Sequence, residues 1–272
     1  MQTHILMAAA LGRPLLRTLA RGADGVTVLS VHQRVINLMS PRGDLLALVA
    51  PELGAGPFNI VLNRWPVEMA DLSPGLAVVY SAPVLSVGPW RINLARAVHW
   101  QPRPDWLALA QAWGDGDALL RRCLETEPQW PLARQLDRIT AQALAAAITA
   151  VVRAPTAAAQ AAALAGLIGL GPGLTPAGDD WLAGWLLRWR LDAAISPRPR
   201  PPLRRQDLTG ATRFSRVLLT GALAGWADEP WHVLLNAVAA HNPAALRQPV
   251  HRILQHGAAS GCAMLAGFLR SS

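Results

Sequence analysis

The residues best suited to chemistry lie in the segment 169–180, which reads GLGPGLTPAGDD. Glycines such as Gly171, Gly173 and Gly178 let the backbone approach a ligand closely, and the two prolines make the segment rigid. A helical run, WLAGW, follows at once, so the loop ends at a helix N-terminus, where unpaired N–H groups and the helix dipole favour an anion. Thr175 adds a hydroxyl donor. The pattern predicts an anion-binding loop, and a purely structural turn before a helix is the alternative.

Two carboxylates complicate this interpretation. Asp179 and Asp180 fall in the first turn of the predicted helix, where carboxylates act as caps, yet a phosphate beside two uncompensated carboxylates would be repelled. They either cap the helix, bind a cation, or accept an amide N–H from a ligand. A ligand with both an NH2 group and an acidic group would satisfy both halves of the segment. Its NH2 group would face the aspartates, and its acidic group would face the N–H donors of the loop.

A second segment near the C-terminus repeats this pattern. Residues 177–186 align with residues 260–269, and each has a small residue, a glycine and then a helix with Leu-Ala-Gly-aromatic-Leu. Small residues let helices approach closely, which predicts that the two helices cross at Gly184 and Gly267. Ser260 and Gly261 would then form a second wall of the site. The alternative is a packing motif that arose twice.

Thr212 and Ser215 are further candidates for binding an anion. They lie three residues apart on a predicted helix and therefore on one face, although such hydroxyls often bond their own backbone. Trp181, Trp185 and Trp189 form a stripe on a helix that is apolar nearly all round, which favours a core or subunit contact over ligand stacking.

The composition excludes several classes of mechanism. All 25 basic residues are arginine, so the chain has no Schiff-base lysine, no lysine general base and no Walker-type lysine. The two cysteines and seven histidines lack metal-ligand spacing, and we expect neither a metal nor another cofactor. The formal charge of +8 suits nucleic acid, but the arginines are dispersed except at residues 198–205 and no reading motif accompanies them, so nucleic-acid binding is not expected.

The order of strand-like and helix-like segments along the chain predicts an α+β fold. A β-rich region, barrel-like or sandwich-like, is expected over residues 1–103, and an all-helical region that carries the glycine-rich loop over residues 104–272. Strands are predicted, after an N-terminal helical stretch to about Leu19, at 26–31, 44–49, 58–62, 76–80, 83–87 and 91–100. Helices are predicted at 131–152, 156–168, 179–192, 208–226, 230–240, 243–255 and 261–270.

Residues 195–205 hold four prolines and four arginines, which predicts an exposed loop that is either a basic arm beside an anionic site or a tolerated insertion. No apolar run reaches the roughly 18 residues of a membrane span, and the apolar N-terminal stretch has its positive charge on the wrong side for a secretory signal. We therefore expect a cytoplasmic protein without a membrane partner.

The segment GLGPGLTPAGDDWLAG, residues 169–184, resembles the family of the H subunit of the oxamate carbamoyltransferase of bacterial allantoin degradation. Segments 30–38, 56–61, 97–102, 212–215 and 257–267 follow in that family's order. The resemblance implies a three-part enzyme that interconverts oxalurate and phosphate with oxamate and carbamoyl phosphate. It also implies other subunits as partners and carbamoyl phosphate, oxamate and oxalurate as small anionic ligands.

On this interpretation Thr175, Asp179 and Asp180 are catalytic. Gly171, Gly173, Gly178, Thr212, Ser215, Ser260 and Gly261 would bind the substrate or its anionic group. The alternative is a non-catalytic scaffold that docks a catalytic partner through its tryptophan-rich helices.

Overall fold

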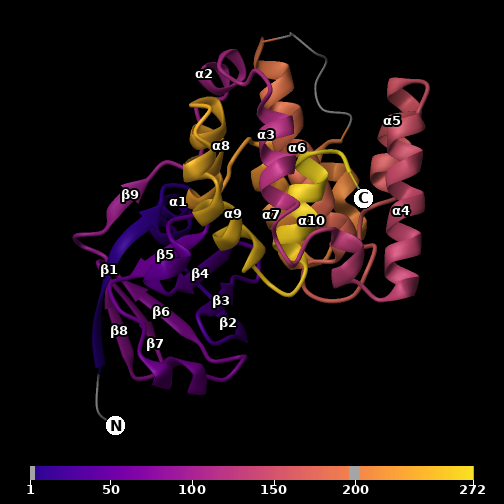
Figure 1. Ribbon diagram of the computed structural model, residues 1–272. Coiled ribbons are helices and arrows are strands. Elements are labelled where there is room, and N and C mark those ends of the chain that lie inside the picture. Colours follow the sequence, from indigo (N-terminus) through magenta and orange to yellow (C-terminus); the bar gives the residue numbers. More distant parts are fainter. Residues whose placement is uncertain (1–3, 196–202, 272) are drawn as a thin grey trace. The chain divides into compact units, whose positions relative to one another are not determined.

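The computed structural model describes residues 4–195 and 203–271, which form two compact units, Met1–Pro102 and Arg103–Ser272 (Figure 1). Most of the predicted arginine and proline loop, residues 196–202, lies outside the described residues. The first unit contains the strands and the second the longer helices, so the predicted α+β class is confirmed.

The first unit is built on one strongly curled sheet. Its strands are β1 (His4–Gly12), β2 (Thr27–Val31), β3 (Val35–Met39), β4 (Leu45–Val49), β5 (Asn59–Leu62), β6 (Val78–Ser81), β7 (Val84–Val87), β8 (Trp90–Asn93) and β9 (Val98–Trp100). The order is β2-β3-β4-β5-β1-β8-β7-β6, and β9 also pairs with β1. A bridge between Thr27 and Ala77, with the Val28 N–H donating to the Leu76 carbonyl at 2.9 Å, joins the two ends of this order. The sheet is therefore a nearly closed barrel, as the β-rich pattern predicted.

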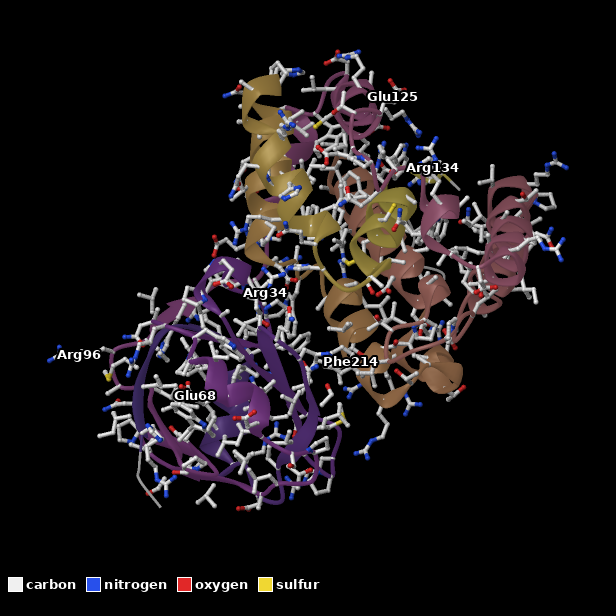
Figure 2. All side chains as sticks on the ribbon, turned by 60° about the horizontal axis from the view of Figure 1, so that its bottom comes forward. Arg34, Glu68, Arg96, Glu125, Arg134 and Phe214 are labelled. Carbon is white, nitrogen blue, oxygen red and sulfur yellow. The ribbon has the colours of Figure 1, made fainter. Side chains whose placement is uncertain are left out.

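The barrel interior is filled by alternate residues of the strands. Leu6, Ile36, Leu48 and Ile92 are among the buried side chains of this core, while Arg96 extends outward from the loop after β8 (Figure 2). Alternation of this kind is what a sheet with one buried face requires.

Three sequence predictions for this unit were wrong. The expected N-terminal helix is strand β1 over most of its length, and only α1 (Leu15–Ala20) is helical, because β1 is hydrogen bonded between β5 and β8 in the middle of the sheet. Strand β3 was not predicted. The single strand expected at 91–100 is two strands, β8 and β9, separated at Leu94–Ala97.

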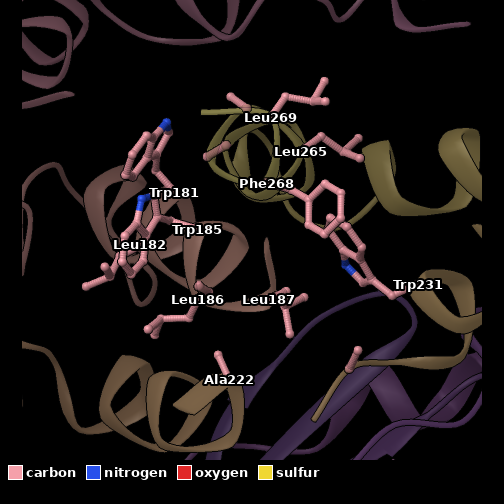
Figure 3. Packing of buried hydrophobic residues seen from close by; sticks show 14 of the residues in the cluster. Trp181, Leu182, Trp185, Leu186, Leu187, Ala222, Trp231, Leu265, Phe268 and Leu269 are labelled. Atoms are coloured by element: carbon pink, nitrogen blue, oxygen red, sulfur yellow. The ribbon is translucent and has the colours of Figure 1, made fainter. Parts of the chain in front are cut away.

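The second unit is helical throughout its regular elements. Its helices are α2 (Trp106–Gln111), α3 (Gly116–Leu124), α4 (Arg138–Arg153), α5 (Ala157–Ala165), α6 (Ala177–Ile195), α7 (Arg213–Leu223), α8 (Glu229–Ala239), α9 (Arg247–Leu254) and α10 (Ser260–Phe268). The long helix expected at 131–152 starts only at Arg138, because Asp137 caps it by accepting the N–H groups of Ile139 and Thr140. Helix α6 is buried nearly all round, and its tryptophans belong to the core of this unit, in which Phe268 of α10 packs beside Trp231 of α8 (Figure 3).

Candidate functional site

The site is centred on the glycine-rich loop that connects α5 to α6. Gly169, Gly171 and Gly173 have φ angles of 76°, 110° and 98°, in the left-handed region that side chains disfavour. Gly178 lies inside α6, where a Cβ would come within 2.1 Å of the Leu167 carbonyl oxygen. The loop therefore packs directly onto the first turn of α6, which fixes the backbone around that helix N-terminus.

Helices α6 and α10 cross at the two glycines that the repeat indicated. A Cβ on Gly184 would lie 1.8 Å from the Met264 carbonyl oxygen, and one on Gly267 would lie 1.8 Å from that of Trp181. The reciprocal contact confirms the predicted crossing. Because both glycines lie seven residues after the start of their helices, the N-termini of α6 and α10 come to the same end of the pair.

This crossing brings together hydroxyl groups that are 85 residues apart in the sequence. The Oγ1 of Thr175 lies 3.0 Å from the Oγ of Ser260, the first residue of α10. Both hydroxyls also lie close enough to the carboxyl group of Asp180, in the first turn of α6, to lower its pKa. Thr175, Asp180 and Ser260 thus form one polar cluster, which we call the hydroxyl–carboxyl cluster.

Asp180 occupies an unusual environment for a carboxyl group. Asp180 is only 5% exposed, and its Oδ2 is buried without a hydrogen-bond partner among the described residues. Burial raises the pKa of Asp180 to about 7, the charge of Asp179 adds to this, and the hydroxyls of Ser260 and Thr175 act in the opposite direction. Near neutral pH this carboxyl can therefore either hold or release a proton.

Asp179 has a different role in the same turn. Its Oδ1 accepts the Gly169 N–H at 2.8 Å, so the carboxylate ties the start of the loop to α6. Burial raises the pKa of Asp179, while the Gly169 N–H and the Ser215 hydroxyl lower it. Its Oδ2 is also buried without a partner in the described part of the chain. Asp179 therefore positions the loop through its contact with the Gly169 N–H.

Thr212 and Ser215 hold the other side of the loop. The Thr212 Oγ1 donates to the Leu174 carbonyl at 2.6 Å and accepts the Ser215 N–H at 3.0 Å as the cap of α7. The Ser215 Oγ lies 3.2 Å from the same carbonyl oxygen. These contacts engage both hydroxyls in fixing the loop, and the neighbouring Arg216 guanidinium donates to the carbonyls of residues 208, 209 and 211.

Gly261 also has a packing role. A Cβ there would meet the Ile253 carbonyl oxygen at 1.8 Å, so this glycine allows α10 to pass close to α9. Of the ten residues predicted to form a site, the structure places Thr175, Asp180 and Ser260 in one cluster. It places Asp179, Thr212, Ser215 and the glycines in the frame around that cluster.

Helix dipoles and carboxyl groups act in opposite directions at this loop. The N-termini of α6, α7 and α10 all lie at this loop, and each contributes the positive end of its dipole. Among the described residues no group of three histidine, cysteine, aspartate or glutamate side chains could hold a metal ion. One framework group, the Leu174 carbonyl, could not be found from the sequence, because backbone acceptors have no side-chain signature.

Family models match most of the chain. The model described as oxamate carbamoyltransferase subunit AllH matches residues 167–272, which include the whole hydroxyl–carboxyl cluster, and the AllH family N-terminal domain matches residues 7–99. The chain belongs to the AllH family. No curated protein and no solved structure matches it. The AllH match supports a subunit role in an oxamate carbamoyltransferase. In the part of the chain that the structure describes, no helix combines the length and apolar character needed to cross a membrane.

Proposed function

We propose that this chain is a subunit of an enzyme that interconverts oxalurate and phosphate with oxamate and carbamoyl phosphate, and that its glycine-rich loop contributes to the reacting site. The observation that supports the proposal is the hydroxyl–carboxyl cluster, where a buried carboxyl with a pKa near neutrality meets two hydroxyls at the N-termini of α6 and α10. The cluster lies within the segment that matches the AllH model.

The reaction requires no covalent intermediate on the protein. In the direction that forms carbamoyl phosphate, a phosphate oxygen bonds to the ureido carbonyl carbon of oxalurate and the bond from that carbon to the oxamate nitrogen breaks. The phosphate loses its proton and the departing nitrogen takes one, so the step neither consumes nor releases a net proton. Such a step needs a bound anion, hydrogen bonds to the developing oxyanion and a proton source.

The loop can provide the first two requirements. At the start of α6 and α10 the N–H groups of Gly178 and Gly261 already donate to the carbonyls of Leu170 and His256. The positive ends of the two helix dipoles would still favour phosphate or a substrate carboxylate there. The hydroxyls of Thr175 and Ser260 are half-buried, so they are nearer to solvent than the carboxyl group whose pKa they lower. A ligand at the loop would meet these two hydroxyls first.

Asp180 would provide the proton. Because the residue is almost fully buried, we infer that it acts through the hydroxyls of Ser260 and Thr175 rather than by touching the substrate. With a pKa of about 7 it can give a proton to one hydroxyl while that hydroxyl protonates the departing nitrogen. This makes Asp180 a positioning and proton-holding residue, with Ser260 and Thr175 as the contacting groups.

The test is turnover of the enzyme assembled with its other subunits. Ser260→Ala and Thr175→Val should each lower kcat/KM by about a hundredfold or more, in the range measured for lost acid–base groups. Thr126→Val is the matched control, because the Thr126 hydroxyl is exposed and bonds only its own backbone neighbour, Cys123. Unchanged turnover in both site variants would contradict the proposal.

A scaffold role is the second candidate, and a different surface favours it. From residue 139 to residue 178 the chain carries a single charged side chain, Arg153. On α4 the side chains of Ile139 and Val152 are 76% and 63% exposed. Trp181, Trp185 and Trp189 are buried in the unit's own core, so a scaffold would dock another subunit through α4 and α5 instead of through these tryptophans.

Assembly measurements separate the two roles. If α4 docks a partner subunit, Ile139→Glu and Val152→Glu should prevent co-purification of the complex, whereas Val98→Glu, an exposed change on β9, should not. Normal assembly of both α4 variants would rule out docking through this surface.

A further inference from the structure

A cavity of about 580 Å³ lies in the helical unit, away from the glycine-rich loop. It is formed by the segment that follows α3 and by the start of α9, and its lining residues are Glu127, Pro128, Gln129, Ala244, Arg247, Gln248 and His251. Small-molecule sites span roughly 300 to 1,000 Å³, so the cavity is large enough for a metabolite.

The cavity and the hydroxyl–carboxyl cluster lie on opposite sides of the first turn of α10. Ser260 faces Thr175, whereas the Cys262 Sγ donates to the backbone carbonyl of Gln129 at 3.3 Å. Two residues along a helix are separated by about 200° around its axis. The cavity is therefore a separate place in the unit, connected to the proposed site through one helical turn.

Two acceptors at the cavity lack donors. The Oε1 of Gln129 is buried without a hydrogen-bond partner among the described residues. Glu127 is 8% exposed and forms no ion pair within residues 4–195 and 203–271. A buried polar group without a partner is unfavourable, so the Oε1 of Gln129 requires a donor that the described chain does not provide, and the carboxylate of Glu127 is available to accept one from a ligand.

A third group at the cavity has the opposite character. Arg247 is exposed at the first position of α9 and forms no ion pair with any described residue. Its guanidinium presents a planar set of donors that matches a carboxylate. One wall of the cavity can therefore bind an anion, and the wall formed by Glu127 and Gln129 can accept N–H groups.

We propose that this cavity binds a small carboxylic acid that also carries an amide or ureido N–H group. Arg247 pairs with the carboxylate of the ligand, and Gln129 and Glu127 accept its N–H groups. The site is distinct from the loop site of the proposed function and does not depend on it.

The test is titration calorimetry of the full chain with oxamate, which carries both groups, oxalate, which lacks the N–H donors, and oxamide, which lacks the carboxylate. Oxamate should bind at least tenfold more tightly than either, a difference of about 1.4 kcal/mol. Arg247→Gln should weaken oxamate binding at least tenfold, and Arg153→Gln, the same change at an exposed position outside the cavity, should leave it unchanged.

Three outcomes would overturn the proposal. The first is that oxamate shows no binding at about 10 mM, because a dissociation constant above that concentration is far weaker than a specific site requires. The second is unchanged binding in Arg247→Gln, an exposed change that preserves the fold. The third is binding that survives Arg247→Gln but is lost in Asp180→Asn, which would place the ligand at the loop and support the proposed function instead.

Discussion

The raised pKa of Asp180 predicts how the stability of this chain depends on pH. An aspartate in an unfolded chain has a pKa of about 3.9, whereas burial raises that of Asp180 to about 7. Between these values the native state keeps a proton that the unfolded chain has released. The free energy of unfolding attributable to this group therefore falls as the pH rises from about 4 to about 7, and it is constant above that interval.

The magnitude follows from the size of the shift. Each pKa unit corresponds to about 1.36 kcal/mol, so a shift of about three units amounts to about 4 kcal/mol at most. Asp180→Asn keeps the shape of the protonated carboxyl but cannot ionise. The variant should therefore match the parent chain near pH 4 and exceed its stability by up to about 4 kcal/mol above pH 7.

Urea unfolding at several pH values between 4 and 8 measures this difference directly. Asp137→Asn is the control, because hydrogen bonds from the Thr140 hydroxyl and from backbone N–H groups lower the pKa of that exposed cap. Its contribution to stability is lost only as the pH falls below the unfolded pKa of about 3.9, so this variant should differ from the parent chain by a nearly constant amount between pH 4 and pH 8. A constant difference between the Asp180→Asn variant and the parent chain from pH 4 to pH 8 would refute the reasoning.

Three further predictions concern the frame of the site. Gly184→Ala should destabilise the chain by about 3 kcal/mol or more in chemical denaturation, because its Cβ meets backbone atoms of α10 that cannot move aside, whereas Gly166→Ala should change stability little. Thr212→Val should cost about 1 to 2 kcal/mol through loss of the α7 cap and of the Leu174 contact, while Thr220→Val, whose hydroxyl bonds its own helix, should cost less. We also propose that residues 1–103 and 104–272 are separate domains, since every buried hydrophobic cluster lies on one side of this boundary. The fragment 104–272 should therefore unfold cooperatively when its unfolding is followed by circular dichroism. A non-cooperative transition would contradict this proposal.

The sequence carried most of the information about the loop and predicted a β-rich, barrel-like first unit, but not the central strand β1. The glycines before α6 and the Leu-Ala-Gly repeat are local patterns with a direct steric meaning, so they predicted the loop, the crossing and the approach of Ser260 to Thr175. Strand β1 was missed because residues 4–12 are apolar almost without interruption, and such a run fits a buried helix as well as a central strand. The distinction is made by β5 and β8, which pair with β1 from far along the chain.

The same division applies to the site residues. Thr212 and Ser215 were predicted to share a helix face, but Thr212 is the N-cap of α7. Both hydroxyls are directed to a backbone carbonyl, which no side-chain pattern reveals. The burial of Asp180, which determines its pKa, depends on how α10 packs on α6. The identities of the groups were therefore readable from the sequence, whereas their protonation and accessibility were not.

The central claim is that Asp180 controls a proton in carbamoyl transfer, and the pH profile of kcat/KM in the assembled enzyme tests it most directly. The account predicts an ionisation near pH 7 in the parent enzyme that disappears in Asp180→Asn together with most of the activity, and that is retained in Asp137→Asn. An Asp180→Asn enzyme with the parent pH profile and the parent kcat/KM would contradict the account.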